Sequence, residues 1–140
     1  MATQIVMGGY GPSTTTHSRA LKIIGEQLIK QFGDKVDVKY VWNIMDFGYK
    51  GEEVLWMSER GLLTLAYQST SYLTDRVPEL EFADLPFLFA SLEEARAAMD
   101  GEFGAYMTRA IENRIPGYKM LGYFENGYRH VSNRLRAIHL

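Results

Sequence analysis

Arginine, tyrosine and histidine side chains near the ends of predicted strands are the residues of this sequence best suited to bind a ligand. Arg129 lies in the run GYRHVSN (residues 127–133), whose pattern predicts a strand with one buried face. A guanidinium held in such a strand can bind a carboxylate through two parallel hydrogen bonds. The alternative is that Arg129 forms an ion pair with a surface acid, as arginines more often do.

Tyr10 and Tyr67 each follow a predicted strand, at the end where open α/β sheets carry their ligands. A tyrosine there can line a pocket and present its hydroxyl, although its ring fits a buried core equally well. His17 lies where a strand-to-helix loop meets the start of a helix, on the same side of such a sheet. The alternative for His17 is an ordinary packed histidine that touches no ligand.

Signatures of catalysis and of metal binding are missing from the sequence. It contains no GxSxG elbow, no HExxH motif, no Walker loop and no GxGxxG loop. The glycines of residues 8–11 follow a strand, but they lack the lysine and the spacing that would surround a phosphate. The three histidines lack the spacing of a zinc site, and the sequence has no cysteine. We therefore expect neither an enzyme nor a bound cofactor or metal ion.

The elements that must position these residues alternate between strand and helix. Alternating polarity and apolar runs predict strands, whereas apolar residues at helical spacing predict amphipathic helices. Such an order is typical of an α/β sheet rich in parallel strands. Strands are expected over residues 5–7, 36–42, 62–67, 118–124 and 128–132, and helices over 18–33, 51–60, 92–99 and 106–114.

Two details refine this pattern. Ser91 and Glu94 form a capping box that should begin a helix, and Gly101 and Gly104 are expected to interrupt or bend it. Phe32 and Trp42 fit core positions, because large rings bury the most area.

The bulk composition indicates one compact domain. The chain has 140 residues, 46% of them hydrophobic, and a formal net charge of −2. This near balance of charge gives no field that would favour nucleic acid or an anionic membrane, so neither partner is expected. The chain begins without the pattern of a secretory signal, so it is either cytoplasmic or has had a signal peptide removed.

Two motifs resemble those of a known family. One is DLPFLF (residues 84–89) followed by a capped helix, and the other is GYFENGYRHVSN (residues 122–133). Together with the order of elements, they resemble the DctP-type solute-binding proteins of tripartite ATP-independent periplasmic (TRAP) transporters. The resemblance runs over essentially the whole chain.

This resemblance implies a protein without catalysis of its own, in which two α/β lobes close around a small organic anion, commonly a carboxylate. It implies that Arg129 contacts the ligand, and that Tyr10, Tyr67 and Gln68 lie on loops lining the same cleft. The expected fold is a periplasmic-binding-protein-like lobe with an open mixed sheet flanked by helices. Residues 1–140 are expected to form the N-terminal ligand-binding lobe, with the second lobe largely absent and the uncovered apolar surface favouring self-association.

The function expected from this resemblance is capture of an organic acid in the periplasm for the membrane permease subunits of a TRAP transporter, after removal of a signal peptide. The alternative is a ligand-sensing or protein-interaction domain that reuses the same lobe. A small hydrolase is the least favoured class, because no nucleophile, base and orienting group can be named together.

Overall fold

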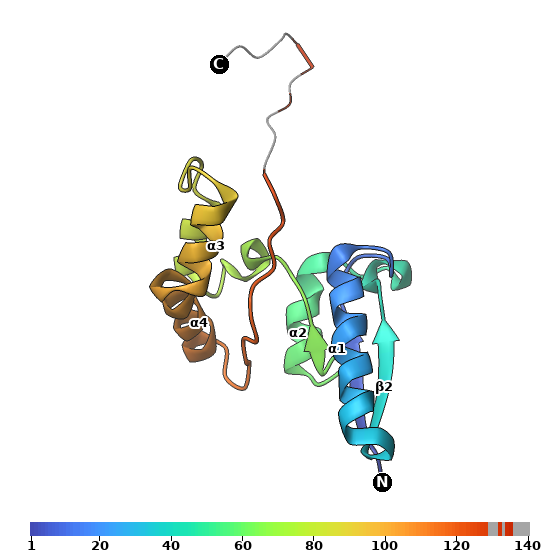
Figure 1. Cartoon of the computed structure of the whole chain (residues 1–140). Coiled ribbons are helices and arrows are strands. Elements are labelled where there is room, and N and C mark those ends of the chain that lie inside the picture. The colour runs from blue at the N-terminus through green and yellow to red at the C-terminus, as the bar shows by residue number, and fades with distance from the viewer. Residues whose placement is uncertain (129–131, 133, 136–140) are drawn as a thin grey trace.

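A parallel three-stranded sheet organises the N-terminal part of the chain (Figure 1). The computed structural model describes residues 1–128, 132, 134 and 135. The strands lie in the order β2-β1-β3, with bounds Thr3–Gly8 for β1, Val36–Val41 for β2 and Leu65–Ala66 for β3. All of β1 pairs with β2, whereas only Met7 and Gly8 pair with β3. The predicted α/β fold is confirmed, with a shorter third strand than the expected 62–67.

The third strand is short because a side chain replaces part of its backbone ladder. Thr64 N donates to Val6 O at 2.7 Å, but Val6 N donates to Thr64 Oγ1 at 3.1 Å rather than to a backbone carbonyl. Regular pairing with β1 therefore begins only at Leu65.

One helix covers each face of this sheet: α1 (Thr16–Phe32) lies on one face and α2 (Val54–Glu59) on the other. Side chains along β1 point alternately to the two faces. Met7 is fully buried in a cluster with Leu21 of α1, whereas Val6 packs against the cluster that contains Val54 and Met57 of α2. The sheet is thus buried between two apolar layers.

A third apolar cluster lies beside the sheet rather than on it (Figure 1). It is built on α4 (Glu102–Arg114), whose Met107 and Ile111 are fully buried. Leu73 and Leu80, from the 3₁₀ helices Thr70–Leu73 and Pro78–Asp84, pack against them. Further 3₁₀ helices span Gly33–Lys35, Ile44–Phe47 and Gly51–Glu53.

The helix ends follow the expected capping chemistry. Ser91 Oγ accepts from Glu94 N at 3.1 Å, so α3 (Leu92–Asp100) begins where the sequence predicts. Gly101 separates α3 from α4, but the expectation that Gly104 also interrupts the helix is wrong, because Gly104 lies inside α4. The tight packing of α4 against the end of α3 requires a glycine there. No helix in the described ranges is long and apolar enough to cross a membrane.

The strand predicted over residues 118–124 does not form. The segment is extended, but it pairs with no strand of the described sheet. Its side chains instead pack on α4 and on the end of β3: Tyr123 bonds to Thr108, and Tyr118 to Gln68. The strand predicted over 128–132 falls largely on residues outside the described part of the chain.

One predicted core position is also wrong. Phe32, which lies in the last turn of α1, is 43% exposed. In the segment of residues 84–89, Phe87 is 98% exposed and has φ at +61°. Trp42 is half-buried and stacks on Tyr40, with ring centroids 4.3 Å apart.

Candidate functional site

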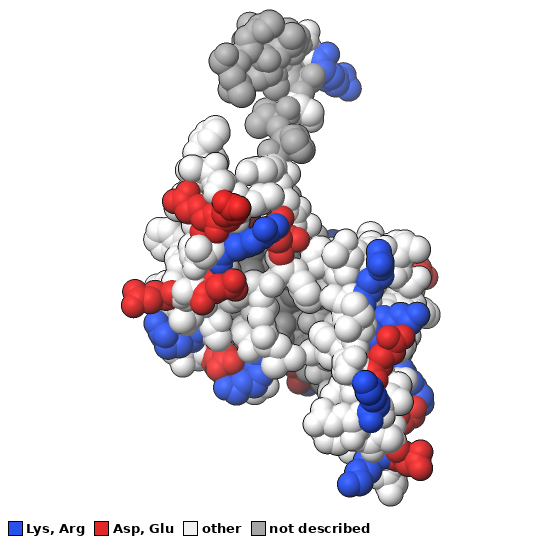
Figure 2. Space-filling model, viewed as in Figure 1, with Lys and Arg blue, Asp and Glu red and all other residues white. Residues whose placement is uncertain are grey.

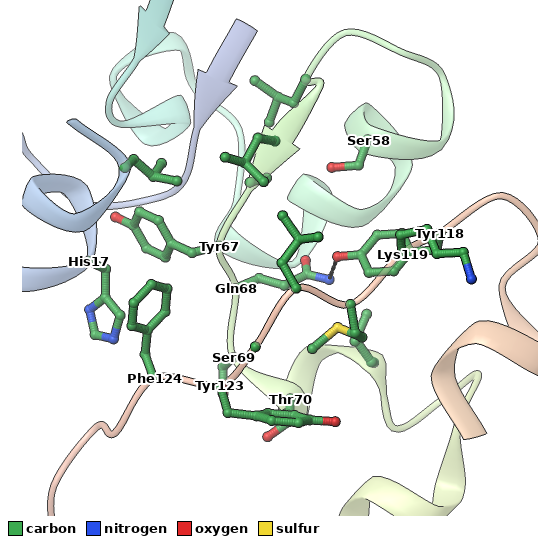
Figure 3. A pocket seen from close by; sticks show the side chains of 18 of the residues that line it. His17, Ser58, Tyr67, Gln68, Ser69, Thr70, Tyr118, Lys119, Tyr123 and Phe124 are labelled. Atoms are coloured by element: carbon green, nitrogen blue, oxygen red, sulfur yellow. Dashed lines mark hydrogen bonds between the residues drawn. The ribbon is translucent and has the colours of Figure 1, made fainter. Parts of the chain in front are cut away.

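A cavity of about 560 Å³ opens where β3, α1 and the C-terminal part of the chain meet (Figure 3). One wall consists of β3 with the residues that follow it, 67–70, and the first turns of α1. The opposite wall is an extended segment, residues 117–126, which we call the return segment. The cavity thus lies beyond the carboxyl end of a parallel strand, where open α/β sheets bind their ligands.

Two glycines just after β1 allow a tyrosine to occupy the centre of the first wall. Tyr67 is 8% exposed, and its hydroxyl lies 3.1 Å from Ser18 Oγ. A Cβ atom at Gly9 would overlap the Tyr67 ring, and one at Gly11 would lie 2.8 Å from the Tyr67 hydroxyl. The close approach of this ring explains both glycines without a bound phosphate.

Aromatic contacts join the two walls. His17 stacks on Tyr67 with ring centroids 5.2 Å apart, and the ring of Phe124 meets His17 edge-on at 5.4 Å. Tyr10 also contacts the ring of Tyr67, at a centroid distance of 5.5 Å. Residues from α1, from the ends of β1 and β3 and from the return segment therefore form one aromatic cluster at the cavity.

A hydrogen bond crosses the cavity between its walls. Gln68 Nε2 donates to the hydroxyl oxygen of Tyr118 at 3.3 Å (Figure 3). Burial is the main reason that the pKa of Tyr118 is raised, so this hydroxyl keeps its proton at neutral pH. The carboxamide oxygen Gln68 Oε1 is buried and has no hydrogen-bond partner among the described residues.

Side-chain bonds to α4 hold the return segment in place. Tyr123 Oη lies 3.0 Å from Thr108 Oγ1, and burial raises the pKa of this tyrosine. Glu112 accepts from Lys119 Nζ at 2.7 Å and from Met120 N at 3.2 Å, and the hydrogen bond from Lys119 is the main cause of its lowered pKa. These bonds position the side chains that face the cavity.

The charged side chains lie mainly on the outer surfaces. Figure 2 shows them along α1 and over α3 and α4, whereas the hollow between these parts is mostly uncharged. Lys119 is the only Lys or Arg among the cavity-lining residues that the structure describes, and it pairs with Glu112. Over the same described ranges, no group of three or more His, Asp or Glu side chains could hold a metal ion.

Four of the five predicted site residues line this one cavity: Tyr10, His17, Tyr67 and Gln68. Whether each of them contacts a ligand stays a prediction. Arg129, the fifth, lies outside the described residues.

Sequence reasoning missed the return segment as a wall. Its aromatic residues Tyr118, Tyr123 and Phe124 fitted a strand pattern, so they were expected in a sheet. The signal that could have found them is the preceding Pro116-Gly117 turn, which directs an aromatic-rich stretch away from the end of α4.

An α/β lobe with a cavity at the ends of its strands is typical of proteins that bind small solutes. The chain belongs to the bacterial extracellular solute-binding proteins of family 7 (DctP), whose family model matches residues 10–139.

Individual relatives agree with this assignment. A solute-binding protein of Verminephrobacter eiseniae is 31% identical over 119 residues, 85% of this chain and 34% of its own length. The 2,3-diketo-L-gulonate-binding periplasmic protein YiaO of Escherichia coli is 30% identical over 73 residues, 52% of this chain and 22% of its own length. The chain thus spans about a third or less of these two relatives.

The chain is also similar in fold to a solved structure. The sugar acid binding protein DctPAm of Advenella mimigardefordensis, in complex with galactonate, is 26% identical with a TM-score of 0.78. The match covers 90% of this chain and 39% of that protein.

Proposed function

We propose that this chain is the ligand-binding lobe of a periplasmic receptor that captures a small organic acid and delivers it to the membrane subunits of a TRAP transporter. Membership of the DctP family supports the proposal. Two relatives that bind organic acids also support it: YiaO is named for binding 2,3-diketo-L-gulonate, and DctPAm was solved in complex with galactonate. The role is binding and transport rather than catalysis.

The cavity between β3 and the return segment carries the proposal. Its volume of about 560 Å³ lies within the roughly 300 to 1,000 Å³ of typical small-molecule sites. Its walls combine aromatic faces with a few polar groups, the composition that fixes a small polar ligand in one orientation.

A screen of organic acids by thermal unfolding tests the function. Galactonate, succinate and related acids are the probes, and neutral sugars of similar size are the controls. A ligand that binds only the folded chain stabilises it by about 2.7 kcal/mol at a hundredfold excess over its Kd. We expect at least one acid to raise the melting temperature by several degrees. Unchanged melting with every acid, in this chain and in a version extended to the length of its relatives, would contradict the proposal.

The carboxylate of such a ligand needs a cation, and we propose Arg129 for this role. The described lining residues supply only Lys119, which is already paired, and the half-buried His17. Arg129 follows the lining residue Asn126 by only three positions. Its planar fork suits a carboxylate through two charge-assisted hydrogen bonds.

Replacing Arg129 should therefore weaken binding without unfolding the chain. Arg129→Lys keeps the charge but loses the fork, and Arg129→Ala loses both, so affinity should fall in that order. Removing one member of a buried charge pair costs about 2 to 5 kcal/mol, at least a roughly thirtyfold loss of affinity. Calorimetric titration measures the loss, and Arg60→Lys at an exposed position is the matched control. A lower melting temperature with unchanged affinity would instead mean that Arg129 braces the fold.

Exposed apolar side chains support the expectation of self-association. Phe47, Phe87 and Leu121 are 71%, 98% and 76% exposed. Surface of this kind favours association when it is contiguous. Self-association stays a prediction.

A further inference from the structure

An unpaired acceptor and an unpaired donor lie next to each other in the cavity wall. Gln68 Oε1 is buried without a partner, and the Tyr118 hydroxyl accepts from Gln68 Nε2 but finds no acceptor for its own hydrogen among the described residues. Both belong to residues that line the cavity. Gln68 Nε2 and Tyr118 Oη are 3.3 Å apart, so the unpaired acceptor and the unpaired donor belong to neighbouring groups of the two walls.

The carboxamide oxygen of Gln68 needs a hydrogen-bond donor from the ligand, and the hydroxyl of Tyr118 needs an acceptor. A buried acceptor or donor left unpaired is costly, so a ligand that satisfies both is favoured over one that satisfies neither. A hydroxyl group can donate to Gln68 Oε1 and accept from Tyr118 at the same time. An ionised carboxylate only accepts, so it would meet the carboxamide oxygen with no hydrogen between them.

Tyr118 stays protonated at neutral pH, so its hydroxyl needs an acceptor from the ligand. Tyr118 packs against the apolar cluster built on α4, and burial is the main cause that raises the pKa of its hydroxyl. The hydroxyl therefore remains a donor at neutral pH, where organic acids are ionised.

We propose that Gln68 and Tyr118 together recognise a hydroxyl group of the bound acid, so the ligands of this chain are hydroxy acids rather than acids with an unsubstituted carbon chain. The inference rests on the proposed function, since it names the class of acid that the cavity takes. Tyr118 is then a residue that determines specificity, while the cation that binds the carboxylate lies elsewhere.

Three four-carbon acids separate these requirements. D-Erythronate carries hydroxyl groups, butyrate has the same charge and length without them, and succinate replaces them with a second carboxylate. Binding is followed by isothermal titration and by the ¹⁵N-labelled side-chain amide signal of Gln68, which also detects weak binding. We expect erythronate to bind at least about tenfold more tightly than butyrate or succinate, the range of one unpaired buried polar group.

A pair of tyrosine variants tests the origin of this preference. Tyr118→Phe should reduce the preference for erythronate to about threefold or less, because the donor is lost while the ring remains. Tyr123→Phe removes a hydroxyl from the same segment, but that hydroxyl already pairs with Thr108. It should therefore leave the preference unchanged, and the melting curves of both variants confirm that they are folded.

Failure of this inference and failure of the proposed function give different experimental results. Equal affinity for erythronate and butyrate, or a full preference retained in Tyr118→Phe, would overturn the inference alone. The second result is also what a resident water molecule between the two groups would give. No binding of the three acids to this chain and to its extended version, with no response to any acid in the thermal-unfolding screen, would overturn the proposed function and the inference with it.

Discussion

Gly104→Ala is expected to destabilise the chain by about 3 kcal/mol or more, although alanine is the better helix former. Gly104 is buried in the first turn of α4, against the end of α3. A Cβ atom there would overlap the carbonyl oxygen of Met99 and lie 2.6 Å from its carbonyl carbon. Backbone atoms cannot turn away as a flexible side chain can, so the two helices would have to separate.

Unfolding in urea measures this effect, with Ala105→Gly as its matched control. Ala105 is exposed on the same helix, so the reverse exchange there should cost only the difference in helix propensity, about 1 kcal/mol. Propensity alone predicts a stabilised Gly104→Ala and a destabilised Ala105→Gly. A Gly104→Ala variant as stable as the parent chain would show that the α3–α4 corner is not tightly packed.

Gly9→Ala should damage both the fold and the cavity, at a cost of about 2 to 4 kcal/mol. The added methyl group would overlap Cε1 and Cζ of Tyr67 and lie 2.8 Å from its Cδ1. This ring cannot move freely, since it is buried, bonded to Ser18 and stacked on His17. Its displacement would break the aromatic cluster that joins the walls of the cavity. Urea unfolding and erythronate titration measure the two losses.

Two further variants separate the clash with the Tyr67 ring from the general effect of replacing a glycine with alanine. Gly122→Ala lies in the return segment, where a Cβ atom would meet no other atom within 4 Å, so stability should change by less than about 0.5 kcal/mol. Tyr67→Leu removes the ring atoms that Gly9→Ala would strike, so the double variant should lose less than the sum of the single ones. Additive losses would mean that the two positions do not interact.

Periodicity in the sequence predicted the elements that make local contacts. The spacing of Leu21 and Leu28 gave α1, although the helix begins two residues earlier than expected because Thr15 caps it. The alternation in β2 and the capping box at Ser91 were equally reliable, since each depends on neighbours a few residues away.

The wrong predictions concern segments whose structure depends on distant partners. The pattern of residues 118–124 is compatible with a strand, but a strand needs an open edge to pair with, and β3 offers only Leu65 and Ala66. Phe32 was expected in the core, yet its side chain is 43% exposed at the end of α1. The sequence shows that a residue is apolar, but it does not show which other part of the chain packs against that residue.

The sequence predicted those residues of the candidate site that lie at or near the ends of strands. Tyr10, His17 and Tyr67 were chosen because of the strand-end rule, and the family resemblance added Gln68; all four line one cavity. Tyr118 was not chosen, because its role follows from a hydrogen bond between residues fifty positions apart. No local pattern encodes such a pairing.

The way the return segment is attached bears on how the cavity of this chain can acquire new ligands during evolution. In the described part of the chain, it is held mainly by side chains, as in the bond from Arg96 to Glu125 at 2.5 Å, and it contributes no strand to the sheet. Substitutions there can reshape one wall of the cavity while β1, α1 and their core stay the same. Descendants of one ancestral chain can therefore diverge in the ligands that fit the cavity by changing about ten residues, without having to evolve a new scaffold.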